Sequence, residues 1–173
     1  MEELQNIKIR LADIVAESVV DGKGIRMTVF VQGCTHACPG CHNPTTWALD
    51  GGEEHTLDFI TEIAEKDPLL DGLTFSGGEP FLQAAPLSVL AEWCHAHNLN
   101  VWSYSGYTLE QLEVMAKSDE GVKNLLSRVD VLVDGPFIEE QKDLTLAFRG
   151  SRNQRVIDMN KTRSSGKVEL LLN

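Results

Sequence analysis

The chain contains 173 residues, of which 42% are hydrophobic and 24% charged, a composition typical of one globular domain, so we expect residues 1–173 to form a single domain. Its 15 Lys and Arg residues against 26 Asp and Glu give a net charge of −11, which argues against nucleic acid as a partner. Residues 1–10 lack the apolar core of a signal peptide and no later run is apolar enough to span a membrane, so we expect a cytoplasmic protein without membrane contact.

Taken in chain order, short apolar and β-branched runs predict a series of strands. Residues 7–20 mix apolar and charged side chains and end at a turn marked by Gly22 and Gly24. Buried strands are expected at residues 26–32, 73–76, 100–104 and 129–133, with a fifth strand at 156–157. The tail is interpreted as a flexible turn at 161–167 ahead of a short strand at 168–172.

Helical patterns fall between these strands. Apolar residues recur at helical spacing over residues 57–64 and 87–94, and Thr108 with Gln111 forms a capping box for a third helix. Alternating strands and helices imply a parallel sheet with right-handed crossovers. A complete eight-fold barrel takes about 250 residues, more than this chain has, so we predict an α/β fold that forms a partial, open βα barrel with a mainly parallel sheet.

Three of the four cysteines, Cys34, Cys38 and Cys41, follow the first buried strand with the spacing C-x3-C-x2-C. Closely spaced thiolates in one loop are typical of an iron–sulfur site. Because three cysteines are one short of the four that close an ordinary cluster, a cubane held here would keep one iron open to a small-molecule ligand. The pattern therefore predicts a reactive metal centre at the carboxyl end of a strand.

Other interpretations of the cysteines remain open at this point. Structural zinc would use His36 or His42 as a fourth ligand, although such sites usually take their ligands as two separated pairs. The odd number of cysteines in the loop disfavours a disulfide framework. Cys94 lies on the apolar stripe of a predicted helix, so we interpret it as a core residue rather than as a further cluster ligand.

Gly77, Gly78 and Glu79 end the second buried strand, which a parallel sheet would place beside the cysteine loop. Two glycines allow a ligand to approach the backbone, whose peptide groups can hydrogen-bond an amino or carboxylate group. The alternative is a tight turn that requires positive φ. The nearby cysteines favour the ligand-binding interpretation.

The combination of C-x3-C-x2-C with a downstream G-G-E in a chain of βα units resembles the radical S-adenosylmethionine enzymes. Further segments extend the likeness over nearly the whole chain, namely D-G-K-G-I-R, F-V-Q-G-C-T-H-A-C-P-G-C-H-N-P-T-T-W, W-S-Y-S-G-Y-T, V-D-V-L-V-D-G-P-F and F-R-G-S-R-N-Q-R-V-I-D. Together they resemble the family of activating proteins of anaerobic ribonucleoside-triphosphate reductase, which are activases of glycyl-radical enzymes. The chain departs from the wider superfamily at Gly40, where an aromatic residue is favoured.

This resemblance implies which residues would hold the cofactors. Cys34, Cys38 and Cys41 would bind a [4Fe–4S] cluster whose open iron takes the amino and carboxylate groups of S-adenosylmethionine. That cofactor would be lined by two segments, Gly40, Cys41 and His42 in the first and Gly77, Gly78 and Glu79 in the second.

The same resemblance implies the reaction and its partners. An electron from a donor such as flavodoxin would cleave the sulfonium bond, and the resulting 5′-deoxyadenosyl radical would generate a glycyl radical on anaerobic ribonucleoside-triphosphate reductase, the protein substrate. Because the cofactors carry the hard chemistry, no general acid or base is expected.

Several other residues have open roles. Glu79 and Asp134 are carboxylates at strand ends that suit helix capping as well as ligand contact. We expect His36 and His42 to shape the loop, and three aromatic residues to serve in the core or at an interface, namely Trp47, Trp102 and Phe137.

The basic stretch at residues 148–155 suggests a contact with the reductase in an otherwise acidic chain. Arg149 and Arg152 are its candidate docking residues, and the alternative for this stretch is a solvated face.

Two other functions are compatible with the same residues. One is the activation of a different glycyl-radical enzyme, or radical chemistry on a metabolite. The other is a non-catalytic module that binds zinc or an iron–sulfur cluster. The absence of further cysteine clusters and the shortness of the barrel favour a protein substrate, because an incomplete barrel leaves its mouth open to a large partner.

Overall fold

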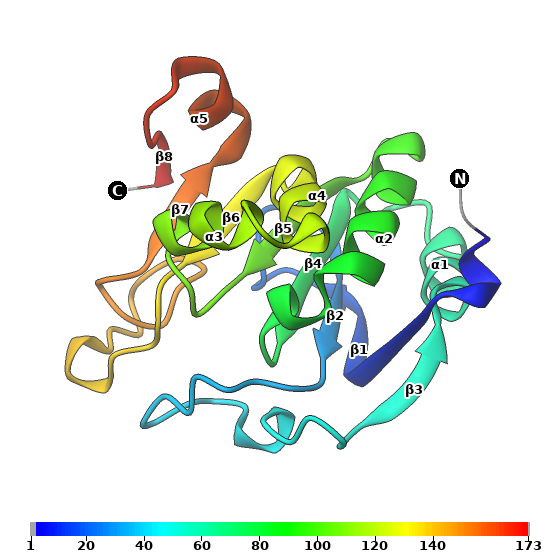
Figure 1. Cartoon of the computed structure of the whole chain (residues 1–173), viewed down its shortest axis with the longest axis horizontal. Helices are drawn as coiled ribbons and strands as arrows, with labels where there is room; N and C mark the ends of the chain where they lie inside the picture. Colours follow the sequence, from blue (N-terminus) through cyan, green and yellow to red (C-terminus); the bar gives the residue numbers. More distant parts are fainter. Residues whose placement is uncertain (1–2, 173) are drawn as a thin grey trace.

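The computed structural model describes residues 3–172, which form an eight-stranded sheet with helices α1 to α4 packed on one of its faces (Figure 1). The strands are β1 (Lys8–Ser18), β2 (Arg26–Val31), β3 (Glu53–Thr56), β4 (Gly72–Gly77), β5 (Asn100–Tyr104), β6 (Val131–Asp134), β7 (Arg155–Asp158) and β8 (Leu170–Leu172). The α-helices are α1 (Leu57–Glu65), α2 (Ala84–Ala96), α3 (Leu109–Ala116), α4 (Glu120–Arg128) and α5 (Met159–Ser165). Short 3-10 helices lie at Leu4–Asn6, Pro44–Thr46, Pro80–Gln83 and Glu139–Gln141.

The sheet is mixed, with the order β3-β1-β2-β4-β5-β6-β7-β8. Only the four central strands β2, β4, β5 and β6 run parallel to one another, whereas β1, β3, β7 and β8 pair antiparallel at the two sides. The prediction of a mainly parallel sheet is therefore wrong. A short turn joins β1 to β2, and a connection of that length permits only antiparallel pairing, because parallel neighbours require a long crossover. The sheet stays open between β3 and β8, and the predicted partial βα barrel is not confirmed.

The parallel centre follows the predicted strands closely. β2 and β4 are almost continuously buried, as their apolar runs indicate, and α2 provides the crossover from β4 to β5. Parallel strands end at a common edge of the sheet, so the loops after β2, β4, β5 and β6 emerge together. This edge positions the candidate site.

Two strands have no clear sequence signal. β1 buries few of its 11 residues and alternates in burial only over Lys8 to Leu11, and the polar strand β3 buries none. Both form because pairing partners are available in the tertiary structure, where Lys8 to Leu11 of β1 lie opposite Thr56 to Glu53 of β3.

Three of the five α-helices in the described part of the chain were predicted from the sequence, and two were not. Helices α1 and α2 cover the predicted stripes, and the capping box of Thr108 and Gln111 is present at the start of α3. Helix α4 was not predicted, and α5 occupies most of the stretch that we expected to be a flexible turn. Asp158 caps the first turn of α5 by accepting a hydrogen bond from the Lys161 amide at 3.0 Å, and Gly166 ends the helix in the left-handed conformation. In the described part of the chain, no helix is long and apolar enough to cross a membrane.

The main core fills the space between the sheet and α1 to α4. Cys94 of α2 is fully buried within it, as predicted for a core residue, and burial raises the pKa of its thiol. A smaller cluster on the opposite face of the sheet contains Trp102, with Phe148 packed edge-on at a centroid distance of 5.2 Å. Trp102 is thus a core aromatic, as predicted.

Arg26 ties the turn before β2 to the starts of the neighbouring strands. Its side chain is fully buried and donates hydrogen bonds to the Thr74 hydroxyl at 2.7 Å and to the Leu73 carbonyl at 2.8 Å. It also donates to the Lys23 carbonyl at 3.0 Å, and its guanidinium lies 5.4 Å from the ring centre of Trp102. Burial lowers the pKa of Arg26 to about 10, which leaves the group charged at neutral pH.

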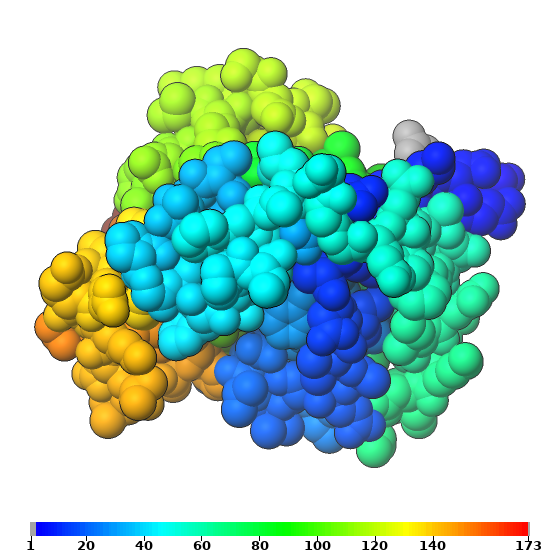
Figure 2. All heavy atoms as spheres, turned by 90° about the horizontal axis from the view of Figure 1, so that it is seen from below, coloured from blue at the N-terminus to red at the C-terminus, as the bar shows by residue number. Residues whose placement is uncertain are grey.

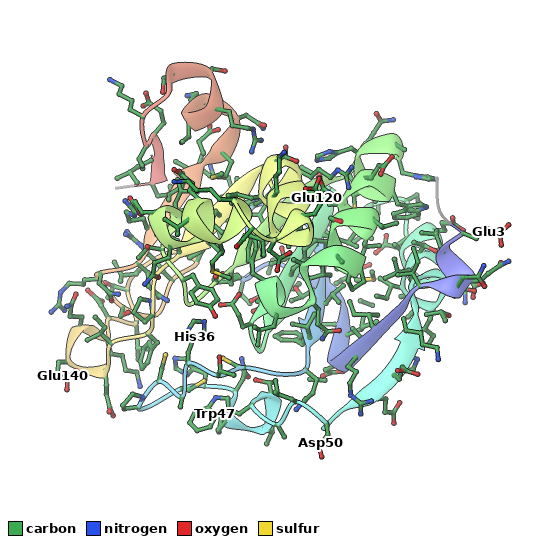
Figure 3. The ribbon with its side chains drawn as sticks, in the orientation of Figure 1. Glu3, His36, Trp47, Asp50, Glu120 and Glu140 are labelled. Carbon is green, nitrogen blue, oxygen red and sulfur yellow. The ribbon has the colours of Figure 1, made fainter. Side chains whose placement is uncertain are left out.

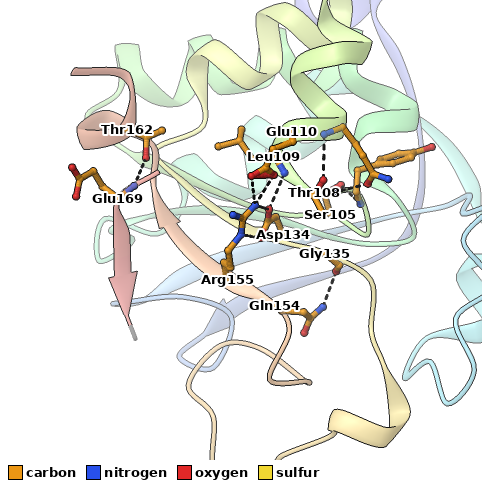
Figure 4. A network of polar contacts seen from close by, with 12 residues as sticks. Ser105, Thr108, Leu109, Glu110, Asp134, Gly135, Gln154, Arg155, Thr162 and Glu169 are labelled. Atoms are coloured by element: carbon orange, nitrogen blue, oxygen red, sulfur yellow. Dashed lines mark hydrogen bonds and ion pairs between the residues drawn. The ribbon is translucent and has the colours of Figure 1, made fainter. Parts of the chain in front are cut away.

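Asp134 joins the end of β6 to the start of α3 (Figure 4). Its buried carboxylate accepts a hydrogen bond from the Leu109 amide at 2.8 Å and one from Arg155 Nε at 3.1 Å. Arg155 also contacts the exposed Glu110 at 2.7 Å, and these two carboxylates raise the pKa of Arg155. Of the two roles considered for Asp134, the structure shows helix capping.

Replacing Asp134 with alanine removes the acceptor of the Leu109 amide and the buried partner of Arg155. We expect Asp134→Ala to lower the free energy of unfolding by about 2–3 kcal/mol, since hydrogen bonds to charged groups contribute about 1.5–3 kcal/mol. The control Glu110→Ala removes the exposed partner of the same arginine and should lower it by less than about 1 kcal/mol. Urea denaturation measures both, and equal losses would contradict a special role of the buried carboxylate.

Candidate functional site

The cysteine loop follows β2 directly and spreads across the edge of the sheet where the parallel strands end. Figure 2 shows its residues on this face between the β1–β2 hairpin and the connection from β6 to β7. In Figure 3, His36 projects from the loop toward the strand ends, and Trp47 lies on the returning part of the same loop. The loop therefore forms one wall of a space above the sheet edge.

Backbone and side-chain hydrogen bonds hold the base of this loop. The Gly33 amide donates to the Thr46 carbonyl at 2.7 Å, and the Cys34 amide donates to the Trp47 carbonyl at 3.1 Å. The buried side chain of Gln32 donates to the Ala48 carbonyl at 2.7 Å and Arg10 donates to the Gly51 carbonyl at 2.9 Å. These contacts close residues 33–52 into a compact loop whose two ends lie side by side.

Cys34, Cys38 and Cys41 all line one cavity of about 440 Å³ above the sheet edge. Each is partly exposed, and each carries a free thiol. The Asn43 amide donates to Cys41 Sγ at 3.4 Å. Burial raises the pKa of the Cys34 thiol, and a hydrogen bond from the His36 backbone amide acts in the opposite direction. The structure thus brings the three predicted metal ligands to one cavity.

The arrangement of the possible metal ligands distinguishes an iron–sulfur cluster from a single metal ion. Within residues 3–172, no three His, Cys, Asp or Glu side chains converge as they would on a single metal ion. A cubane cluster binds each thiolate at a different iron, so its cysteines surround it without meeting at one point. Three soft thiolates facing a common cavity fit such a cluster better than a preformed zinc tetrahedron.

Neither loop histidine completes a ligand set with the cysteines. His36 Nε2 lies 2.6 Å from Glu79 Oε1, and its ring packs edge-on against Tyr107 with a centroid distance of 4.5 Å. His42 packs edge-on against Phe137 at 5.3 Å and lines the cavity. These contacts agree with the prediction that both histidines shape the loop.

Gly77 and Gly78 line the cavity opposite the cysteines. Gly77 has a φ of 96°, a conformation that favours glycine, and a Cβ atom at Gly78 would lie 2.3 Å from the Gly33 carbonyl oxygen. The tight-turn interpretation is therefore correct, and it does not exclude ligand binding because peptide groups of the same turn face the cavity.

Two of the predicted cofactor residues lie outside this wall. Glu79 is fully buried and is not among the residues that line the cavity. Gly40 also does not line it, and a Cβ atom there would lie 3.0 Å from Glu139 and 3.2 Å from Phe137. Glu139 and Phe137 thus lie close to position 40, whose φ of 76° favours glycine, so an aromatic residue there would be strained.

The cavity is also lined by residues that the sequence analysis did not assign to the site. Asp21 lines it from the turn before β2 and Tyr104 from the end of β5, and burial raises the pKa of the Tyr104 hydroxyl. Phe137 and Trp47, predicted as core or interface aromatics, also line it. The only signals for Asp21 and Tyr104 in the sequence were a predicted turn beside Gly22 and the end of the strand predicted at residues 100–104.

The two candidate docking arginines have different environments. Arg149 lines the cavity and donates a hydrogen bond to the Gln154 carbonyl at 3.0 Å. Arg152 is exposed on the connection between β6 and β7. Only Arg152 therefore has the position expected of a residue that meets a partner at the outer surface.

Similarity to known proteins bears on the kind of metal group. The model of a family described as "4Fe-4S single cluster domain" matches residues 20–157. A solved structure, that of QueE from Escherichia coli, is similar with a TM-score of 0.45 and 16% identity over 61% of this chain and 55% of that chain, a likeness too slight to support an inference.

Three curated relatives share more of the sequence, and each is named an anaerobic ribonucleoside-triphosphate reductase-activating protein. The protein from Vibrio cholerae serotype O1 is 40% identical over 145 residues, which cover 79% of this chain and 89% of the relative. The protein from Escherichia coli strain K12 is 34% identical, with 80% and 91% covered, and that from Enterobacteria phage T4 is 32% identical, with 79% and 86% covered.

The close contact between Gly78 and Gly33 leads to a prediction for iron binding. Gly78→Ala should push the two loops apart, lower the free energy of unfolding by about 1–3 kcal/mol, and reduce the iron bound after anaerobic reconstitution. The control is Gly166→Ala, where nothing lies within 4 Å of the added carbon and the φ of 76° adds backbone strain only. That strain costs about 1–2 kcal/mol far from the cysteines, so iron binding should be unchanged. A Gly78→Ala protein with the iron content of the wild type would contradict the prediction.

Proposed function

This chain belongs to the family of anaerobic ribonucleoside-triphosphate reductase-activating proteins, and on that basis we propose that it activates such a reductase by means of a [4Fe–4S] cluster and S-adenosylmethionine. The observation that carries the proposal is the meeting of three thiolates with the Gly77–Gly78 turn at one cavity. Its volume of about 440 Å³ suits a small-molecule cofactor.

Each wall of the cavity has a role in this proposal. Cys34, Cys38 and Cys41 would hold the cluster as thiolates, so loading it releases protons from the cysteines. The peptide groups of Gly77 and Gly78 would bind the amino or carboxylate group of the cofactor. His42 and Phe137, which pack against each other at the cavity, would contact its adenine through their rings.

The bound cluster and S-adenosylmethionine supply reductive cleavage of the sulfonium bond and the radical chemistry that places a glycyl radical on the reductase. The cysteine loop, which forms one wall of the cavity, would shield that chemistry from water on its side. We infer that the electron comes from a small donor such as flavodoxin. The free thiols fit the reducing environment of the cytoplasm, where we place the protein.

Exposed apolar residues around the cavity favour a protein as the partner. Val20 and Leu146 line the cavity at its rim, while Val19 and Leu144 nearby along the chain are 70% and 86% exposed. Exposed apolar side chains at the edge of a site indicate a surface that a protein covers. This favours a protein substrate over a metabolite.

The role of the cysteines can be tested with alanine variants. Cys38→Ala should lose the [4Fe–4S] absorption and electron paramagnetic resonance signals and fall to background in reductive cleavage of S-adenosylmethionine. The control Cys94→Ala removes a thiol from the core of α2 and should keep both properties. A wild-type protein that binds zinc instead of iron, or a cluster signal indifferent to the cofactor, would favour a non-catalytic metal-binding module.

Docking of the reductase can be tested separately from cleavage of S-adenosylmethionine. Arg152→Glu should cleave S-adenosylmethionine at the wild-type rate and lower the yield of glycyl radical on the reductase roughly tenfold, because charge reversal at an interface weakens association. Lys167→Glu, an exposed substitution in the turn after α5, is the matched control and should activate normally. Equal glycyl-radical yields from the two variants would show that Arg152 does not contribute to docking of the reductase. Activation of a different glycyl-radical enzyme in the same assay would identify that enzyme as the protein substrate instead.

A further inference from the structure

Glu79 is the buried centre of a hydrogen-bond network beneath the cysteine loop. Its side chain is fully buried, and Oε1 lies 2.6 Å from His36 Nε2 and accepts from the Gly106 amide at 2.8 Å. Its other oxygen, Oε2, accepts from the Phe81 amide at 3.0 Å, and the Ser105 hydroxyl reaches both oxygens at 2.9 and 3.0 Å. Both carboxylate oxygens are therefore occupied by donors of the protein.

This network separates the carboxylate from the cavity. Glu79 does not line the cavity, although its neighbours Gly77 and Gly78 do. A carboxylate that already accepts from two backbone amides, a hydroxyl and an imidazole has little capacity left for a further ligand. Bringing it to a cofactor would leave the Phe81 and Gly106 amides without their acceptor, which is costly in a buried place.

His36 connects Glu79 to the cysteines. It lies between Cys34 and Cys38 in the sequence. Since the Glu79 oxygens also accept from two backbone amides and a hydroxyl, we assign His36 Nε2 as the donor in their contact. Tyr107 packs against the imidazole, and Gly106 leaves it space, since a Cβ atom there would lie 2.5 Å from His36 Cδ2. The imidazole is thus held between the loop after β5 and the carboxylate.

His36 lies in a part of the loop where the backbone conformation is unfavourable. Ala37, directly after His36, has a φ of 49°, a left-handed conformation that is unfavourable for a non-glycine residue. Burial raises the pKa of the Cys34 thiol, and the His36 backbone amide acts to lower it. This amide follows Cys34 by two residues, just as the Asn43 amide follows Cys41, whose Sγ accepts a hydrogen bond from it at 3.4 Å. Holding the His36 side chain therefore holds the amide that faces the Cys34 sulfur. Hydrogen bonds to cysteine sulfurs are among the factors that set the reduction potential of an iron–sulfur cluster.

We propose that Glu79 is a positioning residue of the metal centre, which fixes the Cys34–Cys38 part of the loop through His36, and that its carboxylate does not contact the cofactor. This inference rests on the proposed function, because it takes the three cysteines as cluster ligands. A reduced cluster carries one more negative charge than an oxidised one, so an amide that donates to its sulfur stabilises the reduced form. Loosening that amide should then lower the reduction potential.

The test is an electron paramagnetic resonance titration of the reduction potential of the reconstituted full chain without S-adenosylmethionine. We expect His36→Leu, which removes the donor, to shift the potential to a lower value. His36→Gln places an amide donor near the position of Nε2 and should restore the wild-type potential. Glu79→Asp keeps the negative charge but withdraws it from His36, so it should shift the potential as His36→Leu does, with no further shift in the double variant.

His55→Leu is the matched control, since it removes an imidazole that also pairs with a carboxylate, Glu53 at 3.3 Å, but lies on β3 outside the cysteine cavity. It should leave the cofactor-free potential unchanged. If Glu79→Asp does not fold, the comparison of His36→Leu with His36→Gln decides the question by itself.

Three outcomes would overturn the proposal. One is a wild-type potential in His36→Leu, and another is a shift from Glu79→Asp that adds in full to that of His36→Leu. The third is a Glu79→Asp protein with unchanged potential but weakened binding of S-adenosylmethionine, which would show that Glu79 contacts the cofactor directly. Failure of the proposed function would be seen earlier and separately, as a wild-type chain that takes up no [4Fe–4S] cluster.

Discussion

The candidate site depends on the parallel pairing of β2 with β4, in which Val31 lies opposite Gly77. Because the two strands run in the same direction, the cysteine loop and the Gly77–Gly78 turn leave the sheet side by side. The Gly78 amide donates to the Val31 carbonyl and the Glu79 amide donates to the Gly33 carbonyl, both at 2.8 Å. The pairing thus continues past the ends of the strands and into the site.

Buried polar groups continue this framework around the strand ends. Glu79 links the cysteine loop to the turn after β5, and Asp134 links the end of β6 to the start of α3. Both carboxylates have their acceptor positions filled by backbone amides and side-chain donors, a requirement for polar groups in an interior of low polarity. The loops that form the cavity are therefore held by the same interactions that stabilise the sheet edge, and a reactive centre benefits from such preorganised walls.

Much of the central fold was predictable because the responsible interactions are local or depend on simple burial. The apolar run at β2, the helical stripes of α1 and α2 and the capping box at Thr108 each report a structure that the nearby sequence largely decides. The outer strands were not predictable in this way. β1 and β3 are mostly exposed and pair with each other although they lie far apart in the sequence, so the mixed character of the sheet could not be inferred from periodicity.

The chemistry of the site is already present in the amino-acid sequence, which places three thiolates in one loop after a buried strand and a glycine turn at the end of the next. Which neighbouring side chains face the cavity depends instead on burial and on contacts between distant loops, and therefore on the folded chain. The folded chain turns Glu79 inward to four donor groups, brings Phe137 and Glu139 against the exposed Gly40, and brings Asp21 and Tyr104 to the cavity. Residue types identify the donors available to a metal centre, but only the packing of the chain selects those that can reach it.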